Sequence, residues 1–418
     1  PVQSTLSQSF FDKNDLISTF STSSRRIEYR EYLANRTKEI SKLKLNLTNE
    51  KKWISYIREI SNILFKSDKI FYILNSTKDY LPNGTSQFQK SFIDAALALY
   101  PNQFTDLIYN LYKDTDNSQV FGSSVFYLLN NNRINEEEAL KESNLRFNKN
   151  FTDPLLKNLK LSLSDSLNSV FSNQPPLVDL FSNPFQKDKT IIFSLHRKNR
   201  KYHGITIIRK PDMTFLRNKD STIFYVPQLA LSITNLPGFF PQGNTPQGIF
   251  SIVGYYISPT ETIGPTPNVL TRIPFEVSTE IFYHKEVKST KWYLNDYTNL
   301  LPDSWKNYFP IYESFYAGLL GRRLIVMHGS ADDPDYFRDQ VYYPLTPSRG
   351  CLTTIEIWSE LNGKCIESDQ IKLINGLIST NQLYGFLVVI ELNNEQKPVN
   401  IEEISKLIEK AETISRDL

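Results

Sequence analysis

The hydrophobic period of the chain changes once, near the middle, and this change most constrains the possible fold. From about residue 10 to residue 171, apolar residues recur every three or four positions, as on amphipathic helices. After residue 186 the pattern becomes short alternating runs rich in β-branched and aromatic residues, which is typical of strands. The sequence therefore predicts an α+β protein, with an all-helical domain over 1–185 followed by a mostly β domain over 186–395.

Several segments carry these two periods clearly. In the first half, 51–65 places one apolar stripe on a helix, and 91–100 and 104–112 repeat its spacing. The strands that we expect in the second half are 190–197, 203–210, 229–235, 249–257, 322–328 and 384–392.

A proline-rich segment and a final helix complete the expected organisation. Residues 172–185 contain three prolines between the helical and the strand-like sequence, which places the domain boundary there. Residues 396–418 predict an amphipathic helix that packs against the sheet, with Asn400 as its N-cap and Glu403 three residues later. Its apolar face comprises Ile401, Ile404, Leu407, Ile408, Ala411 and Ile414.

Composition narrows the class of protein. Charged residues make up 22% of the 418 residues and the formal net charge is +2, as in ordinary globular proteins, and the basic runs are too short to indicate nucleic-acid binding. No apolar run approaches the roughly 20 residues of a membrane span. The chain begins at Pro1, which fits either removal of a signal peptide or trimming of the sequence.

The two cysteines and four histidines point to one stretch of the chain. His328-Gly329 and Gly350-Cys351 lie within 28 residues of each other. A thiol of ordinary pKa, about 8.5, is mostly protonated at neutral pH, so a nucleophilic cysteine needs a base such as an imidazole. A glycine beside each group keeps side-chain bulk away from a substrate. The stretch therefore predicts a cysteine–histidine site, with main-chain amides near Cys351 available to an oxyanion.

Together with a second motif, this stretch resembles a known catalytic family. Residues 245–250 read Thr-Pro-Gln-Gly-Ile-Phe, and residues 348–351 read Ser-Arg-Gly-Cys downstream of His328-Gly329. The pair resembles the L,D-transpeptidase catalytic domain, or YkuD-like family, over about residues 190 to 392. The resemblance implies a YkuD-like β-rich catalytic domain with a lid insertion at about 259–320.

The resemblance also implies a reaction and its participants. Cys351 would attack a peptidoglycan stem tetrapeptide, forming a thioester that an amine resolves into a 3–3 cross-link, and His328 would move the protons. Carbapenem-type inhibitors would acylate the same thiol, and the protein would be periplasmic or secreted. No cofactor or metal is expected. The catalytic residues implied are Cys351, His328, Ser348 and Gly350, and the substrate-binding residues are Arg349, Gly329, Thr353 and Tyr343.

This sequence departs from the family at two positions. The family usually has histidine where this chain has Arg349, and arginine where it has Thr353. Threonine cannot make the bidentate contact of a guanidinium with a carboxylate, so Arg349, Arg322, Arg323 or Arg338 would have to replace it. Twelve aromatic residues between 275 and 316 favour a lid over the catalytic groove, although the same rings could form a core of their own.

Other interpretations remain open on sequence alone. The same Cys–His site would serve an L,D-carboxypeptidase or endopeptidase if water replaced the amine. A protein that kept the fold could also bind the cell wall without catalysis. Cys351 could instead be a structural thiol or pair with Cys365. A caspase-like protease fits less well, because Arg-Gly precedes Cys351 and only 23 positions separate it from His328.

Overall fold

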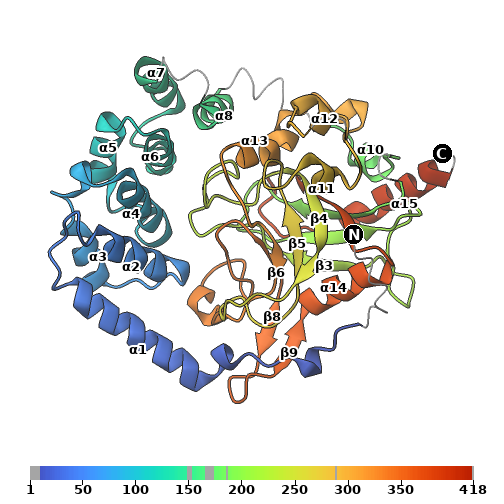
Figure 1. The fold of residues 1–418 in the computed structure, drawn as a ribbon, viewed down its shortest axis with the longest axis horizontal. Coiled ribbons are helices and arrows are strands. Elements are labelled where there is room, and N and C mark those ends of the chain that lie inside the picture. Colours follow the sequence, from blue (N-terminus) through green and yellow to red (C-terminus); the bar gives the residue numbers. More distant parts are fainter. Residues whose placement is uncertain (1–9, 148–152, 165–173, 185–186, 288–289, 417–418) are drawn as a thin grey trace.

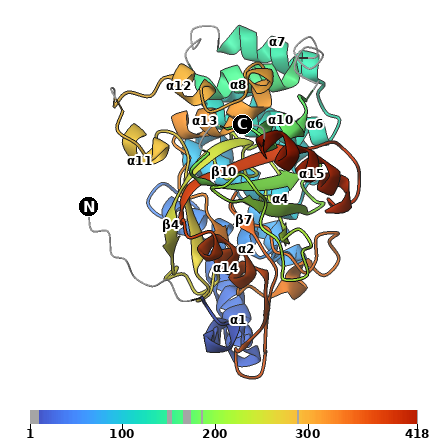
Figure 2. The same cartoon turned by 90° about the vertical axis from the view of Figure 1, so that its right-hand side faces the viewer.

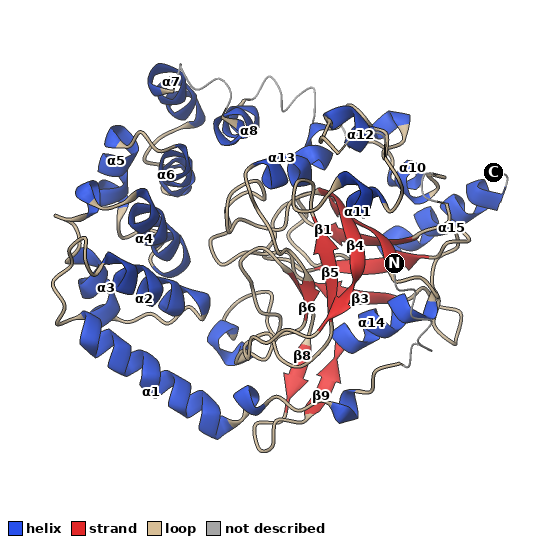
Figure 3. Ribbon diagram, viewed as in Figure 1, coloured by secondary structure: helices blue, strands red, loops and turns tan. Residues whose placement is uncertain are grey.

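The structure is a computed structural model that describes residues 10–147, 153–164, 174–184, 187–287 and 290–416. It is a mixed α/β fold, with 42% helix and 15% strand. Helices α1 to α8 form an arc beside a part of the molecule that holds the strands (Figures 1 and 3). These helices are α1 (Ser23–Ile40), α2 (Glu50–Asn62), α3 (Asp68–Asn75), α4 (Ser86–Leu99), α5 (Thr105–Asp114), α6 (Ser118–Asn130), α7 (Glu136–Arg146) and α8 (Pro154–Leu163).

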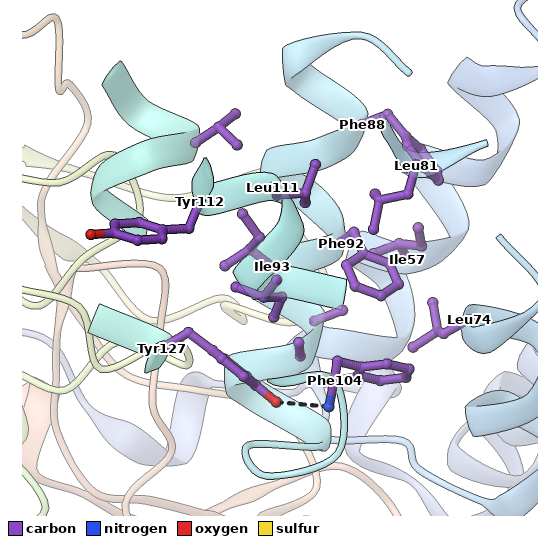
Figure 4. Close-up of a cluster of buried hydrophobic side chains, with 14 of the residues drawn as sticks. Ile57, Leu74, Leu81, Phe88, Phe92, Ile93, Phe104, Leu111, Tyr112 and Tyr127 are labelled. Atoms are coloured by element: carbon purple, nitrogen blue, oxygen red, sulfur yellow. Dashed lines mark hydrogen bonds between the residues drawn. The ribbon is translucent and has the colours of Figure 1, made fainter. Parts of the chain in front are cut away.

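The helical part, residues 23–164, has a hydrophobic core of its own. Figure 4 shows apolar and aromatic side chains from several helices meeting there, and the Tyr127 hydroxyl accepts a 3.0 Å hydrogen bond from the Phe104 amide. The stripe predicted over 51–65 is confirmed, because its apolar residues on α2 are buried in this core. The described residues up to 184 form no strand beyond a single bridge at Ile17, as the helical period predicts.

The strands form one large sheet and a separate hairpin. Their bounds are β1 (Thr190–His196), β2 (Gly204–Arg209), β3 (Tyr225–Gln228), β4 (Gly248–Tyr256), β5 (Asn268–Arg272), β6 (Met327–His328), β7 (Leu352–Thr353), β8 (Glu356–Trp358), β9 (Cys365–Ser368) and β10 (Tyr384–Glu391). The large sheet has the order β3-β2-β1-β10-β4-β5-β6-β7, and β8 pairs with β9. Bridges from Leu229 to Thr353 and from Ser232 to Ser348 bring its two edges together, so the sheet is nearly closed.

Both faces of the sheet are covered, which explains why β1 and β2 are buried along their whole length. One face packs against α10, α15 and the segment 279–315, and the other packs against α14. The helices on this side are α10 (Leu177–Phe181), α11 (Thr279–Tyr283), α12 (Leu294–Thr298), α13 (Glu313–Leu319), α14 (Asp369–Ser379) and α15 (Glu402–Arg416). The expected C-terminal helix is therefore confirmed as α15, and its Glu403 accepts a 3.0 Å hydrogen bond from the Asn400 amide.

Two expected strands differ from the structure. Residues 229–235 make only isolated bridges, and of 322–328 only Met327–His328 is a strand. Both segments run along the edges where the sheet closes. Their main-chain groups form hydrogen bonds there with other parts of the chain. The Arg322 amide, for example, donates to the Ala317 carbonyl at 3.0 Å instead of extending the ladder.

The sequence predicts one helical domain over 1–185, but residues near both ends of this segment pack on the sheet part. The Ser18 amide donates to the Gly363 carbonyl at 2.8 Å, so the first described residues lie on the hairpin β8–β9. At the other end, α10 buries Phe181 in the core beneath the sheet, and its carbonyl accepts from Arg209 at 2.9 Å. The boundary expected between 185 and 186 falls outside the described residues.

The helical and sheet parts share an apolar contact. Leu155 of α8 and Phe126 of α6 pack with Phe239 and Phe240, and α8 lies against α13 (Figure 2). The rings of Phe126 and Phe240 meet edge to face at 5.4 Å. Of the helices in the described ranges, none combines the length and apolar character needed to cross a bilayer.

Candidate functional site

The pairing of β6 with β7 brings the cysteine and the histidine to one place. These strands are parallel, with Met327 opposite Leu352 and His328 opposite Thr353. Cys351 directly precedes β7, and side chains alternate along a strand, so Cys351, Thr353 and His328 belong to the same face. The position is the seam at which the nearly closed sheet meets itself.

Cys351 and His328 line the same cleft, which has a volume of about 220 Å³. The sheet part contributes further wall residues, which are Ile233, Thr260, Thr262, Ile263, Ser330, Asp332 and residues 346–349. The helical part contributes the remaining wall with Tyr29, Asn62 and Ile63. The cleft therefore lies between the two parts of the molecule, a common place for small-molecule sites.

The His328 imidazole is held in one orientation. Its Nδ1 lies against the carbonyl oxygen of Gly329, which can only accept, so Nδ1 carries the proton and donates. Nε2 is then the unprotonated nitrogen that can take a proton from another group. Burial lowers the pKa of His328, and the Gly329 contact opposes this shift. The residue is therefore neutral at pH 7 and available as a base.

The Cys351 thiol is free and half-buried. It donates to the Leu324 carbonyl at 3.4 Å, and it is not hydrogen-bonded to His328 in this conformation. Burial raises the pKa of Cys351, while the Val326 amide and the Arg322 charge oppose that rise. Cys365 is also free, so these two cysteines form no disulfide.

The turn before Cys351 is braced by Ser348. The Ser348 hydroxyl accepts from the Gly350 amide at 3.0 Å and donates to the Cys351 carbonyl at 2.8 Å. Thr245, from the first family-like motif, donates to the Gly350 carbonyl at 3.0 Å. Within the described residues, the Cys351 amide itself has no protein acceptor. That amide, rather than the amide of Gly350, is therefore the donor left for an oxyanion.

The Arg322 guanidinium lies against this turn at Gly350. Its guanidinium is buried and donates to the carbonyls of Gly238, Gly243 and Asn244, the last two at 3.0 and 2.8 Å. Gly350 has a φ of +111°, and a Cβ there would collide with this guanidinium, so only glycine fits. Burial lowers the pKa of Arg322 to about 10, which leaves it charged at neutral pH and close enough to favour the thiolate.

Two carboxyl groups lie near the His328–Gly329 segment. A Cβ on Gly329 would collide with the Glu356 carboxyl, whose pKa burial raises to about 7. Asp332 lines the cleft, and burial together with the neighbouring Asp333 raises its pKa to about 7. Asp333 is in turn paired with Arg26 at 3.3 Å and Arg30 at 2.5 Å, which ties this loop to α1.

The four residues expected to bind substrate have different surroundings. Arg349 lines the cleft, but its Nε donates to Asn62 Oδ1 at 2.8 Å, so it also joins the turn to α2. Thr353 is 1% exposed and donates to the Thr346 carbonyl at 2.7 Å, which makes it a buried structural contact instead of a substrate contact.

Tyr343 is exposed beside Arg338 and is not among the cleft residues. Gly329 contributes the carbonyl that orients His328.

The aromatic segment does not form a lid over this cleft. None of the twelve rings between 275 and 316, all within the described residues, lines it. Most of them are buried against one face of the sheet, together with residues of β1 and β10. The apolar surface of that face explains their number, because each ring removes a large area from water there. Of the described residues of the expected lid, only Thr260, Thr262 and Ile263 line the cleft.

Sequence reasoning missed the wall contributed by the helical part. Tyr29, Asn62 and Ile63 lie about 290 to 320 positions from Cys351, and no motif surrounds them. The adjacent acidic pair at 332–333, directly after the His328 segment, was a signal that could have been followed. In the described part of the chain, no cluster of three or more histidine, cysteine or carboxylate side chains has a geometry suited to a metal ion.

No protein-family model, no curated protein and no solved structure matches this chain.

Proposed function

We propose that the protein is an L,D-transpeptidase-like cysteine acyltransferase that acts on peptidoglycan stem tetrapeptides. The observation that supports this most strongly is that Cys351 and an oriented, neutral His328 line one cleft. A thiol, a base with a free Nε2 and an unused amide are the parts that acyl transfer requires.

The reaction would proceed through a thioester. As the Cys351 sulfur attacks the donor carbonyl, His328 Nε2 takes the thiol proton and the Cys351 amide donates to the developing oxyanion. Collapse of the tetrahedral intermediate breaks the amide bond, and the imidazolium returns the proton to the departing D-amino acid. An acceptor amine then attacks the thioester, loses its proton to His328 and restores the thiol.

The resting thiol and imidazole are both neutral in this mechanism, since burial raises the pKa of Cys351 and lowers that of His328. His328 therefore acts as a general base during attack and does not hold a preformed ion pair. The thiol must turn from the Leu324 carbonyl toward Nε2 when substrate enters. Arg322 stabilises the sulfur as negative charge develops on it.

Purified protein should be incubated with disaccharide tetrapeptides, and the masses of the products should be measured by mass spectrometry. A dimer with loss of one D-alanine, formed by the wild type but not by Cys351→Ala, supports transpeptidation. Loss of D-alanine without a dimer identifies a carboxypeptidase that uses the same site. Unchanged masses with folded protein contradict an enzymatic role and favour a wall-binding protein.

A further inference from the structure

A second, larger cavity lies between the helical and sheet parts, and the acyl-transfer mechanism does not use it. Its volume is about 830 Å³, compared with about 220 Å³ for the cleft of Cys351. Helices α6 and α8 line one side, and the sheet part lines the other with residues from 235–247, 308–313 and 391–394. This size and this position between two parts of a chain are those of a ligand site.

The sheet side of the cavity carries a buried polar cluster. Arg200 is 3% exposed and donates from Nε to Glu391 at 2.9 Å, while its Nη1 is buried without a hydrogen-bond partner. Gln247 donates to the other Glu391 oxygen at 3.1 Å. The Glu313 carboxylate accepts a 2.8 Å hydrogen bond from the main-chain amide of Gln247. A buried donor left unpaired costs roughly 1 to 3 kcal/mol, so an acceptor oxygen in the cavity would satisfy Arg200.

The chemistry of the lining favours an uncharged ligand. Two cationic residues, Lys198 and Arg200, face the carboxyl groups of Glu313 and Glu391. Burial raises the pKa of Glu313 to about 7, so the lining carries a net charge between zero and +1 at neutral pH and attracts an ion only weakly. The remaining polar groups are mainly side-chain amides, which both donate and accept. They are Asn130, Asn158, Gln174, Asn235, Asn244, Gln247, Asn393 and Asn394.

Aromatic side chains supply the apolar part of the lining. Phe126, Phe239, Tyr308 and Phe309 all contribute to the walls. Rings combined with amides and a carboxylate–guanidinium pair match a ligand that has many hydroxyl groups and apolar C–H faces. A peptide chain has fewer hydroxyl groups, and a lipid acyl chain would leave Arg200 Nη1 without an acceptor.

We propose that this cavity binds a short saccharide. Under the acyltransferase function proposed above, on which this assignment of the natural ligand rests, the saccharide is a segment of the peptidoglycan glycan strand. Its binding to the cavity requires neither Cys351 nor His328, so the two activities can be tested separately.

Binding of an N-acetylglucosamine tetramer, and of glycan strands stripped of stem peptides, should be measured by ligand-observed NMR and calorimetry with Cys351→Ala and wild-type protein. Both proteins should bind equally. Ser162→Trp places a large ring into the cavity from an exposed position of α8 and should weaken binding about tenfold or more. Lys157→Trp, exposed on the same helix and not lining the cavity, should bind like the wild type.

Each remaining outcome bears on one of the two proposals. Absence of saccharide binding at millimolar concentration, or equal binding by folded Ser162→Trp, overturns the saccharide site. Equally tight binding of a sugar-free stem peptide, blocked by Ser162→Trp, overturns the choice of a saccharide. Saccharide binding by a protein that leaves muropeptides unchanged contradicts the acyltransferase and leaves the cavity assignment standing. Muropeptide cross-linking without saccharide binding supports the acyltransferase and overturns the cavity assignment.

Discussion

The helical part and the sheet part differ in what they bring to the cleft. The sheet part holds every histidine and cysteine of the chain, and its closing seam positions Cys351 and His328. The helical part has its own core and no such group, yet it forms one wall of the cleft. Under the proposed function, the reacting groups therefore belong to the sheet part, whereas the walls of the cleft come from both parts.

The contacts between the two parts near the cleft are specific and polar. Arg26 and Arg30 of α1 pair with the buried Asp333, and Arg349 bonds with Asn62 of α2. These contacts attach the helices to the two loops that carry the reacting groups. Changes in the sheet part should therefore affect the chemical step most, and changes in the helical contacts should affect binding.

The largest effect should come from removing the nucleophile. Cys351→Ala leaves the imidazole and the turn in place but removes the atom that forms the thioester, so product formation should fall to background. Muropeptide turnover measures this effect, with the unfolding temperature as a check on the fold. Cys365→Ala is the matched control because Cys365 lies on β9 and is not among the cleft residues. Loss of activity in Cys365→Ala alone would contradict the assignment.

Removing the base should have the next largest effect. His328→Gln keeps a similar shape but cannot accept the thiol proton, so kcat should fall by roughly 10² to 10⁴. The decrease should be smallest at high pH, where hydroxide can ionise the thiol instead. His284→Gln is the control, because the half-buried His284 contacts Ser251 and the Gly385 carbonyl and does not line the cleft. A pH profile of His328→Gln with the same shape as the wild type would argue against the base.

Arg322 should affect the pKa of the thiol. Its charge opposes the burial that raises the pKa of Cys351, so Arg322→Met should move this pKa still higher. The thiolate fraction at a given pH then falls, and the alkylation rate should reach its half-maximum at a higher pH than in the wild type. Rates with iodoacetamide across a pH series measure the shift. Arg322→Lys retains the charge and should therefore show a smaller shift than Arg322→Met. An unchanged pH profile of alkylation in Arg322→Met would contradict the electrostatic role.

Loosening the helical wall should have a smaller and different effect. Asp333→Asn removes the charge that pairs with Arg26 and Arg30 but can still cap the turn through the Asp335 amide. We expect KM to rise several-fold with little change in kcat, and the unfolding free energy to fall by about 1 to 3 kcal/mol. Steady-state kinetics and denaturation measure both. A fall in kcat with unchanged KM would place the helical part in the chemical step.

The smallest expected effect concerns stability and pH. The pKa of Glu356 is raised to about 7, above its value in the unfolded chain, so its contribution to stability is present below about pH 4.5 and is lost as the pH rises through 7. The unfolding temperature of Glu356→Gln should therefore decline less between pH 5 and pH 8 than that of the wild type. Parallel melting curves across this range test it. Equal declines would show that Glu356 is not protonated in the fold.

Much of the fold could be predicted from the hydrophobic period of the sequence, whereas the cleft could be predicted only in part. Helix α2 could be predicted because one buried face repeats along it. Strands β1, β4 and β10 could be predicted because they are short runs rich in β-branched and aromatic residues, and they are buried over most of their length. The two motifs predicted a site at Cys351 and His328, and both residues line one cleft, while their catalytic role stays a prediction. The wall from Asn62 could not be predicted, since it depends on how the helical and sheet parts pack against each other. The aromatic segment was misplaced because ring content alone does not show which surface the rings cover.

The most direct test of the central claim is the intact mass of the protein after exposure to a carbapenem. If the Cys351 sulfur can reach an activated carbonyl in the cleft with His328 beside it, the wild type should gain the full mass of one ring-opened carbapenem. Peptide mapping should locate the adduct at Cys351, and Cys351→Ala should show none. A folded wild-type protein that gains no mass, or that carries the adduct on Cys365, would contradict the account.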